Sequence, residues 1–112
     1  MPGRNESPAH ETVLAARIVA MAEDRIRRRV TVHGRVQGVF FRDSLRQRAN
    51  SHHVAGWATN RVDGAVEAVF EGRPDDVERL VEFAKSGLRQ AEVETVEVRE
   101  EDPEGLNGFE IR

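Results

Sequence analysis

The spacing of apolar side chains switches repeatedly between strand-like and helix-like along this chain, and this alternation constrains the fold more than any other feature. Apolar residues at every second position are typical of a half-buried strand, whereas a repeat of three or four is typical of an amphipathic helix. The spacing predicts a strand ending at Gly34, a helix from Phe41 to about 50–53, strands over 54–60 and 65–70, a helix over 74–87, and strands over 93–100 and 108–112. The predicted order is βαββαβ followed by a short terminal strand.

A charged residue interrupts the beginning of the first strand. Ile26, Val30 and Val32 fall on one face of that strand, but Arg28 falls on the same face. Side chains alternate between the two faces of a strand, so an arginine among apolar neighbours weakens the pattern. We therefore expect regular strand from about Arg29.

Turn and cap residues separate the later elements. The pair Asp63-Gly64 lies between two apolar runs and predicts a tight hairpin, because glycine accepts the positive φ that such a turn requires. Pro74 suits the first position of a helix, and the two acids after it favour the positive end of the helix dipole. The apolar faces of the two helices are expected to consist of Phe41, Leu45 and Ala49 in the first, and Val77, Leu80, Val81 and Ala84 in the second.

This order of elements predicts a ferredoxin-like α+β sandwich, with an antiparallel-rich sheet of four to five strands and two helices on one face. The first strand, first helix and second strand form a crossover connection. Such connections are right-handed in nearly all proteins, so the two strands run parallel and their C-terminal ends meet at one rim of the sheet. We expect Arg42, after the first strand, and Asn60, at the end of the second, to lie together at that rim.

One domain is expected over residues 25–112, because a chain of 112 residues has the length of one typical domain. Residues 1–24 contain two prolines, one glycine and only a weak amphipathic pattern, so we expect a flexible or loosely helical N-terminal extension there. Met21 is an alternative start site to Met1. No apolar run approaches the ~20 residues that a membrane-spanning helix needs.

The chain contains no cysteine, which excludes disulfides, thiolate metal sites and a cysteine nucleophile. The N-terminal segment also lacks the charged-then-apolar order of a signal peptide. We therefore expect a cytoplasmic protein that uses no metal and no cofactor. The lack of long apolar runs outside the predicted core favours a monomer.

Charge is distributed unevenly along the chain. Residues 25–50 carry eight arginines against the single acid Asp43, whereas residues 51–112 carry fifteen acids against seven basic residues. Two interpretations are open at this point. Either the basic segment attracts an anionic ligand, or the two groups of charges face one another across the sheet.

The segment GRVQGVFFR, Gly34 to Arg42, joins the first strand to the first helix. A loop bent by Gly34 and Gly38 can turn successive backbone N–H groups inward, and the start of the helix adds free N–H groups of its own. Arg42 adds a permanent positive charge and a planar fork that suits two phosphate oxygens. The loop is therefore a candidate oxyanion site. The lysine of a P-loop is missing, and a solvent-exposed arginine at a helix start is the alternative interpretation.

The segments GRVQGVFFR and GWATNRVDGAVE, at this separation, closely resemble the two motifs of the acylphosphatase family, and the resemblance extends from about residue 29 to the end. It implies hydrolysis of the carboxyl–phosphate bond of acyl phosphates. It also implies that Asn60 positions the attacking water and that Arg42 binds the phosphoryl group. The loop amides that would assist Arg42 belong to Val36, Gln37, Gly38, Val39, Phe40 and Phe41.

Such a reaction needs few catalytic groups. The leaving group is a carboxylate, which is already stable as an anion near neutral pH, so little general-acid help is required. Phosphoryl transfer depends mainly on alignment and on stabilisation of charge. We expect direct in-line attack by water, with no covalent intermediate.

Two other functions remain open. A non-hydrolytic module that binds acyl or carbamoyl phosphate would use the same loop, although Asn60 has no evident purpose unless water must be placed. A ferredoxin-like RNA-binding domain would use aromatic side chains on the sheet and the arginine-rich segment. Against that function, the chain has no tyrosine and a pI of about 5.8. The expected partner is a small molecule rather than a nucleic acid or a membrane.

Five further residues have both a structural and a functional interpretation. His33 is expected to be structural or exposed, and Trp57 to pack on its strand. Phe41 is expected in the core, while Phe40 is expected to flank the acyl group of the substrate. Asp43 is expected to interact with the helix dipole.

Overall fold

The helices and strands follow the predicted order over the residues that the computed structural model describes, 24–86 and 88–112. In chain order they are β1 (Ile26–Arg35), α2 (Phe41–Ser51), β2 (Ala55–Asn60), β3 (Val66–Gly72), α3 (Pro74–Ser86), β4 (Glu92–Glu101) and β5 (Phe109–Ile111). The expected extension up to residue 23, the start site at Met21 and the expected helix end at Gly87 lie outside the described residues. Neither of the described helices is long and apolar enough to cross a membrane.

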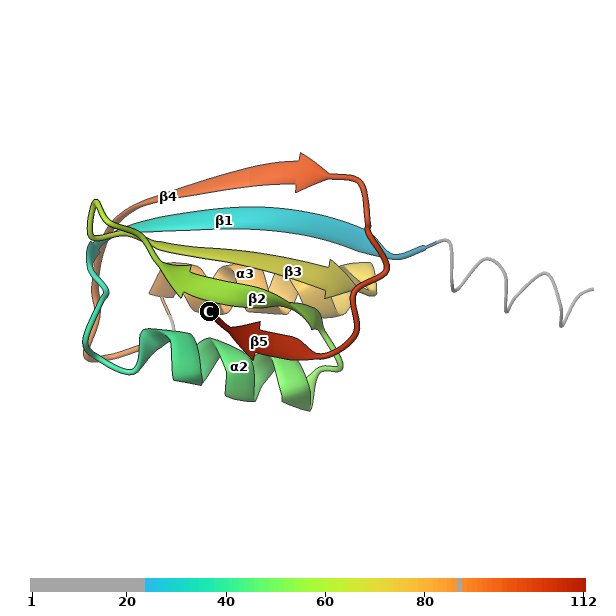
Figure 1. Ribbon diagram of the computed structural model, residues 1–112, viewed down its shortest axis with the longest axis horizontal. Coiled ribbons are helices and arrows are strands. Elements are labelled where there is room, and N and C mark those ends of the chain that lie inside the picture. The colour runs from blue at the N-terminus through green and yellow to red at the C-terminus, as the bar shows by residue number, and fades with distance from the viewer. Residues whose placement is uncertain (1–23, 87) are drawn as a thin grey trace, which may run out of the picture.

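The five strands form one mixed sheet in the order β4-β1-β3-β2-β5. Strand β3 lies between β1 and β2 and pairs antiparallel with both, so β1 and β2 run parallel to each other. Strand β5 pairs parallel with the outer side of β2. Figure 1 shows the helices on one side of this sheet and the opposite side open. The predicted ferredoxin-like α+β fold is confirmed.

The hydrophobic core lies between the sheet and the two helices. Both predicted helix faces are buried: Phe41, Leu45 and Ala49 on α2, and Val77, Leu80, Val81 and Ala84 on α3. Val30 and Val32 of β1 and Phe70 of β3 meet them from the sheet. Full burial of one such valine, leucine or phenylalanine stabilises the fold by about 1.5–3 kcal/mol.

Strand β1 begins at Ile26, three residues before the expected Arg29. The reason lies on the open face of the sheet, where arginines of β1 meet carboxylates of the neighbouring strands. Arg27 Nη1 donates to Glu71 Oε2 at 2.6 Å and Arg27 Nε to Glu101 Oε1 at 2.8 Å. Arg29 donates to Glu101 and to Glu67, both at 2.7 Å. These partners lie 38 to 74 positions away in the sequence, so apolar spacing alone could not reveal them.

Glu71 is a fully buried carboxylate that connects three parts of the domain. Besides Arg27, it accepts hydrogen bonds from the backbone N–H groups of Glu104, Gly105 and Leu106 at 3.0–3.2 Å. Burial alone would raise the pKa of Glu71, but the hydrogen bonds from Arg27 and from the three amides outweigh it and lower the pKa. Glu71 therefore stays ionised and fixes the loop between β4 and β5.

Most of the arginine-rich segment is paired within the domain. Arg27, Arg28, Arg29 and Arg35 of β1 form ion pairs with glutamates of β3, β4 and the loop after β4. Arg46 pairs with Asp43 on α2. The described aspartates and glutamates leave three arginines of this segment without a partner within 4.0 Å: Arg25, Arg42 and Arg48. The charges of the first strand therefore face carboxylates across the sheet, and only the three unpaired arginines remain for another role.

Gly34 lies inside β1, which continues to Arg35 instead of ending at Gly34 as expected. The register with β4 shifts between His33 and Gly34, and Gly34 has a φ of 131°. A Cβ at this position would lie 2.1 Å from the carbonyl oxygen of Glu92. Gly34 therefore permits close contact with β4 at a bulge, and the bend of the loop begins after it.

The acidic partner shared by Arg27 and Arg29 makes stability depend on pH. Hydrogen bonds from Arg29 and Arg27 lower the pKa of Glu101 from 4.5 to about 2. Because the folded pKa lies below the unfolded value, this interaction stabilises the domain fully above about pH 4.5 and is lost as the pH falls toward 2. We expect Glu101→Gln to lower the free energy of unfolding at pH 7 by on the order of 1 kcal/mol.

Urea unfolding of wild type and variant across pH 2–7 checks this expectation. The difference in free energy of unfolding between wild type and Glu101→Gln should shrink as the pH falls. Glu100→Gln is the matched control, because Glu100 is 83% exposed and makes one long contact of 3.4 Å with Arg28. Equal effects of the two substitutions, or a difference that does not change with pH, would contradict the assigned role of Glu101.

Candidate active site

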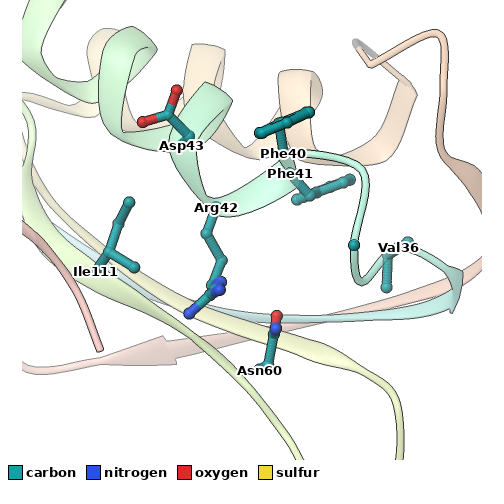
Figure 2. A pocket seen from close by; sticks show the side chains of 8 residues that line it. Val36, Phe40, Phe41, Arg42, Asp43, Asn60 and Ile111 are labelled. Carbon is teal, nitrogen blue, oxygen red and sulfur yellow. The ribbon is translucent and has the colours of Figure 1, made fainter.

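Arg42 and Asn60 lie on one pocket at the rim where β1 and β2 end, as the crossover geometry predicts. Arg42 comes from the first turn of α2 and Asn60 from the last position of β2. Figure 2 shows the two side chains extending toward each other from opposite sides of the pocket. The pocket has a volume of about 250 Å³. Liquid water occupies roughly 30 Å³ per molecule, so this volume suits a phosphoryl group with a short acyl chain.

The loop between β1 and α2 supplies the backbone of the pocket. Gly38 has a φ of 78°, and Phe40, which directly precedes α2, has a φ of 61°. A phenylalanine in this left-handed region costs about 1–2 kcal/mol, so the surrounding structure holds it there. The N–H groups of residues 36–40 donate no hydrogen bond to any described residue. A row of free amides beside a helix N-terminus is suited to accepting an oxyanion.

Arg42 has no described aspartate or glutamate partner, and its position is fixed by the main chain at Arg112. Its Nη1 donates to the main-chain oxygen of Arg112 at 3.0 Å. That oxygen also accepts a hydrogen bond from Thr59 Oγ1 at 3.3 Å. The remaining N–H groups of the Arg42 guanidinium make no hydrogen bond within the described parts of the chain, so they are free to bind an anion.

Asn60 ends β2, opposite Val66 of β3, and its side chain is exposed. Its amide group makes no hydrogen bond to another residue in the described ranges 24–86 and 88–112. An amide carries both donor and acceptor atoms, so it can hold a water molecule in a defined orientation. The side chain is therefore available at the pocket instead of being used by the fold.

The six predicted loop residues divide into two groups. Val36, Gly38, Phe40 and Phe41 line the pocket, and Gln37 and Val39 do not. Val39 is partly buried against the core. The Gln37 side chain turns to the β2–β3 hairpin, where its Nε2 donates to the carbonyl oxygens of Arg61 at 2.8 Å and Ala65 at 2.9 Å.

The contacts of Gln37 give its side chain a role that sequence reasoning missed. They fasten the loop to the hairpin that begins directly after Asn60. The sequence suggested only a backbone amide at this position. A clue was available in retrospect, because a glutamine between apolar neighbours needs a partner for its amide group.

Other predicted roles are resolved by burial and contacts. Phe41 is 3% exposed and belongs to the core, whereas Phe40 is 83% exposed beside the pocket. The ring of Trp57 packs on β2 between the guanidinium groups of Arg29 and Arg112, at 5.3 and 4.8 Å from the ring centroid. The structural roles expected for Phe41 and Trp57 are confirmed.

Two charged or polar residues near the loop are occupied by local partners. His33 Nε2 lies 2.8 Å from Glu97 on the neighbouring strand β4. The Asp43 carboxylate lies on the pocket but accepts hydrogen bonds from Arg46 at 2.5 Å and Gln47 at 2.9 Å on its own helix. The negative charge of Asp43 is thus largely directed to α2 and away from Arg42.

Strand β5 and the residue after it each contribute to the site in a way that the sequence did not indicate. Ile111 lines the pocket and Arg112 holds Arg42. Their position depends on the parallel pairing of β5 with β2, and a three-residue strand carries no signal of its partner. The described residues contain no group of three or more histidine or acidic side chains arranged to hold a metal ion.

Comparison with known proteins identifies the family. The sequence profile of the Acylphosphatase family matches residues 28–111. An acylphosphatase from Haloarcula marismortui is 55% identical over 86 residues, covering 77% of this chain and 94% of that protein. An acylphosphatase from Thermococcus kodakarensis is 48% identical over 87 residues, covering 78% and 96%. The solved structure of an acylphosphatase from Coxiella burnetii is 37% identical, has a TM-score of 0.77, and is matched over 82% of this chain and 97% of that one.

The ferredoxin-like sandwich and the profile match place this protein among the small α+β hydrolases. Within that class, the chain belongs to the acylphosphatase family. Relatives of this identity over most of the chain make it an acylphosphatase enzyme.

The role of the two hydrogen bonds from Gln37 to the β2–β3 hairpin can be tested by substitution. Gln37→Met keeps the length of the side chain but removes both hydrogen bonds to the hairpin. We expect the free energy of unfolding to fall by about 1–2 kcal/mol, the cost of two such bonds. Activity should fall on the order of tenfold, because a loop displaced from Asn60 aligns the reacting groups less well.

Urea unfolding and steady-state hydrolysis of benzoyl phosphate measure the two effects. Gln90→Met is the control, because Gln90 is exposed in the turn before β4. Activity that is unchanged in Gln37→Met would show that the side chain contributes only to stability.

Proposed function

We propose that this acylphosphatase binds the phosphoryl group of its substrate between Arg42 and the free amides of residues 36–41, and that Asn60 places the attacking water. One observation carries this proposal. A loop whose amides have no partner among the described residues lies beside an arginine that no described aspartate or glutamate neutralises. Both features leave positive charge directed at one pocket, and an acyl phosphate carries the negative charge that matches it.

The proposed reaction is direct hydrolysis. Water attacks phosphorus in line with the bond to the acyl oxygen, that bond breaks, and the electron pair leaves with the carboxylate. Loop amides and the Arg42 guanidinium stabilise the charge on the phosphoryl oxygens, while the side chain of Asn60 orients the water. The leaving carboxylate needs no proton at neutral pH, so a site without a dedicated acid is sufficient. We propose that the reaction needs no metal ion, because Arg42 and the amides supply the positive charge.

The geometry favours this function over a binding-only module. The exposed amide of Asn60, unbonded within the described chain, is directed at the pocket from the side opposite Arg42. A binding module would need the loop and Arg42 but would gain little from this second group. We therefore assign Asn60 to the water.

The open face of the sheet has few of the features with which a ferredoxin-like domain binds RNA. Trp57 is the aromatic residue of that face with a strand position suited to stacking, and its ring is enclosed by Arg29 and Arg112. The arginines of β1 are neutralised by Glu67, Glu71 and Glu101. We propose that the protein acts on a small acyl phosphate, as a cytoplasmic monomer.

Substitutions at the two proposed catalytic residues test the assignment. We expect Arg42→Ala and Asn60→Ala each to lower kcat by at least about 10²–10³, the typical cost of one preorganised group in a transition state. Loss of acetyl or benzoyl phosphate, followed in EDTA, measures the rate. Arg48→Ala is the matched control on α2, because Arg48 has no described carboxylate partner and stacks on Phe83 at 4.5 Å. Full activity in Asn60→Ala would overturn the role of Asn60, and activity that requires added metal would overturn the metal-free reaction.

The position of attack can be read from isotope incorporation. In water enriched in oxygen-18, attack on phosphorus places the label in inorganic phosphate and leaves the carboxylate unlabelled. We expect this result, together with no protein-bound phosphate when a reaction with phosphorus-32-labelled acetyl phosphate is quenched in acid during turnover. Label in the carboxylate would show attack on the carbonyl carbon. A trapped phosphoprotein would show a covalent intermediate.

A further inference from the structure

A second pocket lies at the rim of the sheet opposite the candidate active site. It is formed where α2 ends, where β2 begins, where β3 passes into α3, and along the loop that precedes β5. Its volume is about 530 Å³, roughly twice that of the candidate active site. Arg25, His53 and Arg73 line it, and Asp76 is the one acidic residue on its described lining. We call it the far-rim pocket.

The two arginines of the far-rim pocket resemble Arg42 in having no described aspartate or glutamate partner. Neither Arg25 nor Arg73 lies within 4.0 Å of a carboxylate oxygen in the described parts of the chain. The four arginines of β1, in contrast, form ion pairs with glutamates of the described chain. Asp76 is itself engaged, with Arg79 at 3.2 Å and His52 at 3.8 Å. The pocket therefore carries an excess of positive charge.

Arg25 provides an independent observation. Its Nη2 donates to the carbonyl oxygen of Leu106 at 3.3 Å, which holds the guanidinium against the loop before β5. Its Nε is buried and has no hydrogen-bond partner among the described residues. A buried donor on a charged group is costly to leave unpaired, and burial keeps bulk water from it. The guanidinium of Arg25 is therefore held at the wall of the far-rim pocket without an aspartate or glutamate to neutralise it.

We propose that the far-rim pocket binds a small oxyanion with two or more negative charges, of the phosphate-ester class. The charge of the two arginines on one lining attracts such a ligand, and guanidinium groups match the geometry of its oxygens. The volume leaves room for an organic group besides the phosphate. Neither the acyl phosphate chemistry nor the family assignment provides a role for this pocket, so the inference is independent of the proposed function.

The far-rim pocket and the candidate active site lie at opposite ends of β2, so the NMR signals of backbone amides near one pocket are distinct from those near the other. The pocket includes Val54 and Ala55 near the start of β2, whereas Asn60 ends that strand. Gly108 also lines it and accepts a hydrogen bond from the N–H of Gly56 at 2.9 Å. Backbone amides near the two sites therefore belong to different residues, and binding at each can be followed separately.

Amide NMR titration of the full chain with inorganic phosphate, and then with phenyl phosphate, tests the proposal. The titration uses the Arg42→Ala variant at constant ionic strength, so that binding at the candidate active site is weakened. We expect saturable shifts of the amides of Asn50, Gly72 and Gly108, with tighter binding of phenyl phosphate. Substitution of Arg73→Gln, and of Arg25→Gln with Arg73→Gln, should weaken this binding by about tenfold or more.

Arg99→Gln is the matched control, because Arg99 is exposed on β4, has no described carboxylate partner and does not line the pocket. It should leave the titration unchanged. The proposal is wrong if the Arg42→Ala variant shows no saturable shifts around the far-rim pocket, or if those shifts persist with equal affinity in Arg73→Gln. Arg73 is exposed, so its variant remains a valid test even if substitution of the partly buried Arg25 impairs folding.

Discussion

The antiparallel pairing of β3 with both β1 and β2 is the constraint on which the rest of the structure depends. It makes β1 and β2 parallel, and it brings their C-terminal ends to the same rim. Arg42 and Asn60, eighteen positions apart in the sequence, meet there across one pocket. No direct contact between these two residues is needed to build the site, because each is carried to it by its own element. The pairing of β3 with β1 and β2 therefore both supports the core and brings the residues of the candidate active site together.

A second set of contacts connects the distant end of the sheet to the candidate active site. Glu71 holds the loop at 104–106, and this loop leads into β5. Strand β5 pairs with β2 and ends beside Arg112, whose main-chain oxygen holds Arg42. The position of Arg42 therefore rests partly on a buried carboxylate at the opposite end of the domain. Rigid packing transmits this positional constraint along β5.

The sequence was informative wherever local rules decide the structure. The spacing of Phe41, Leu45 and Ala49 predicted the buried face of α2, and Asp63-Gly64 predicted the hairpin between β2 and β3. The crossover rule predicted which rim carries Arg42 and Asn60. The two motifs supplied the family, and the comparisons confirmed it. These features depend on a few neighbouring residues, or on a topological rule with very few exceptions.

The sequence did not predict the contacts that depend on the pairing of strands far apart in the chain. The start of β1 depends on carboxylates that reach it from β3 and β4, and the partners of Gln37 belong to a hairpin that begins more than twenty positions later. The parallel placement of β5 determines what Arg42 contacts, yet three residues encode little about their neighbour. Each of these contacts requires knowing which strands are adjacent before any pair of side chains can be matched.

The ion pairs on the open face also affect how the domain responds to heating. Arg27, Arg29, Glu67, Glu71 and Glu101 form one connected network instead of separate pairs. Because the hydration of ions carries a negative entropy, removing charged groups from water becomes less costly as temperature rises, while hydrophobic stabilisation levels off. The ion pairs of the uncovered side therefore become more favourable on warming relative to the apolar contacts of the helix-covered side.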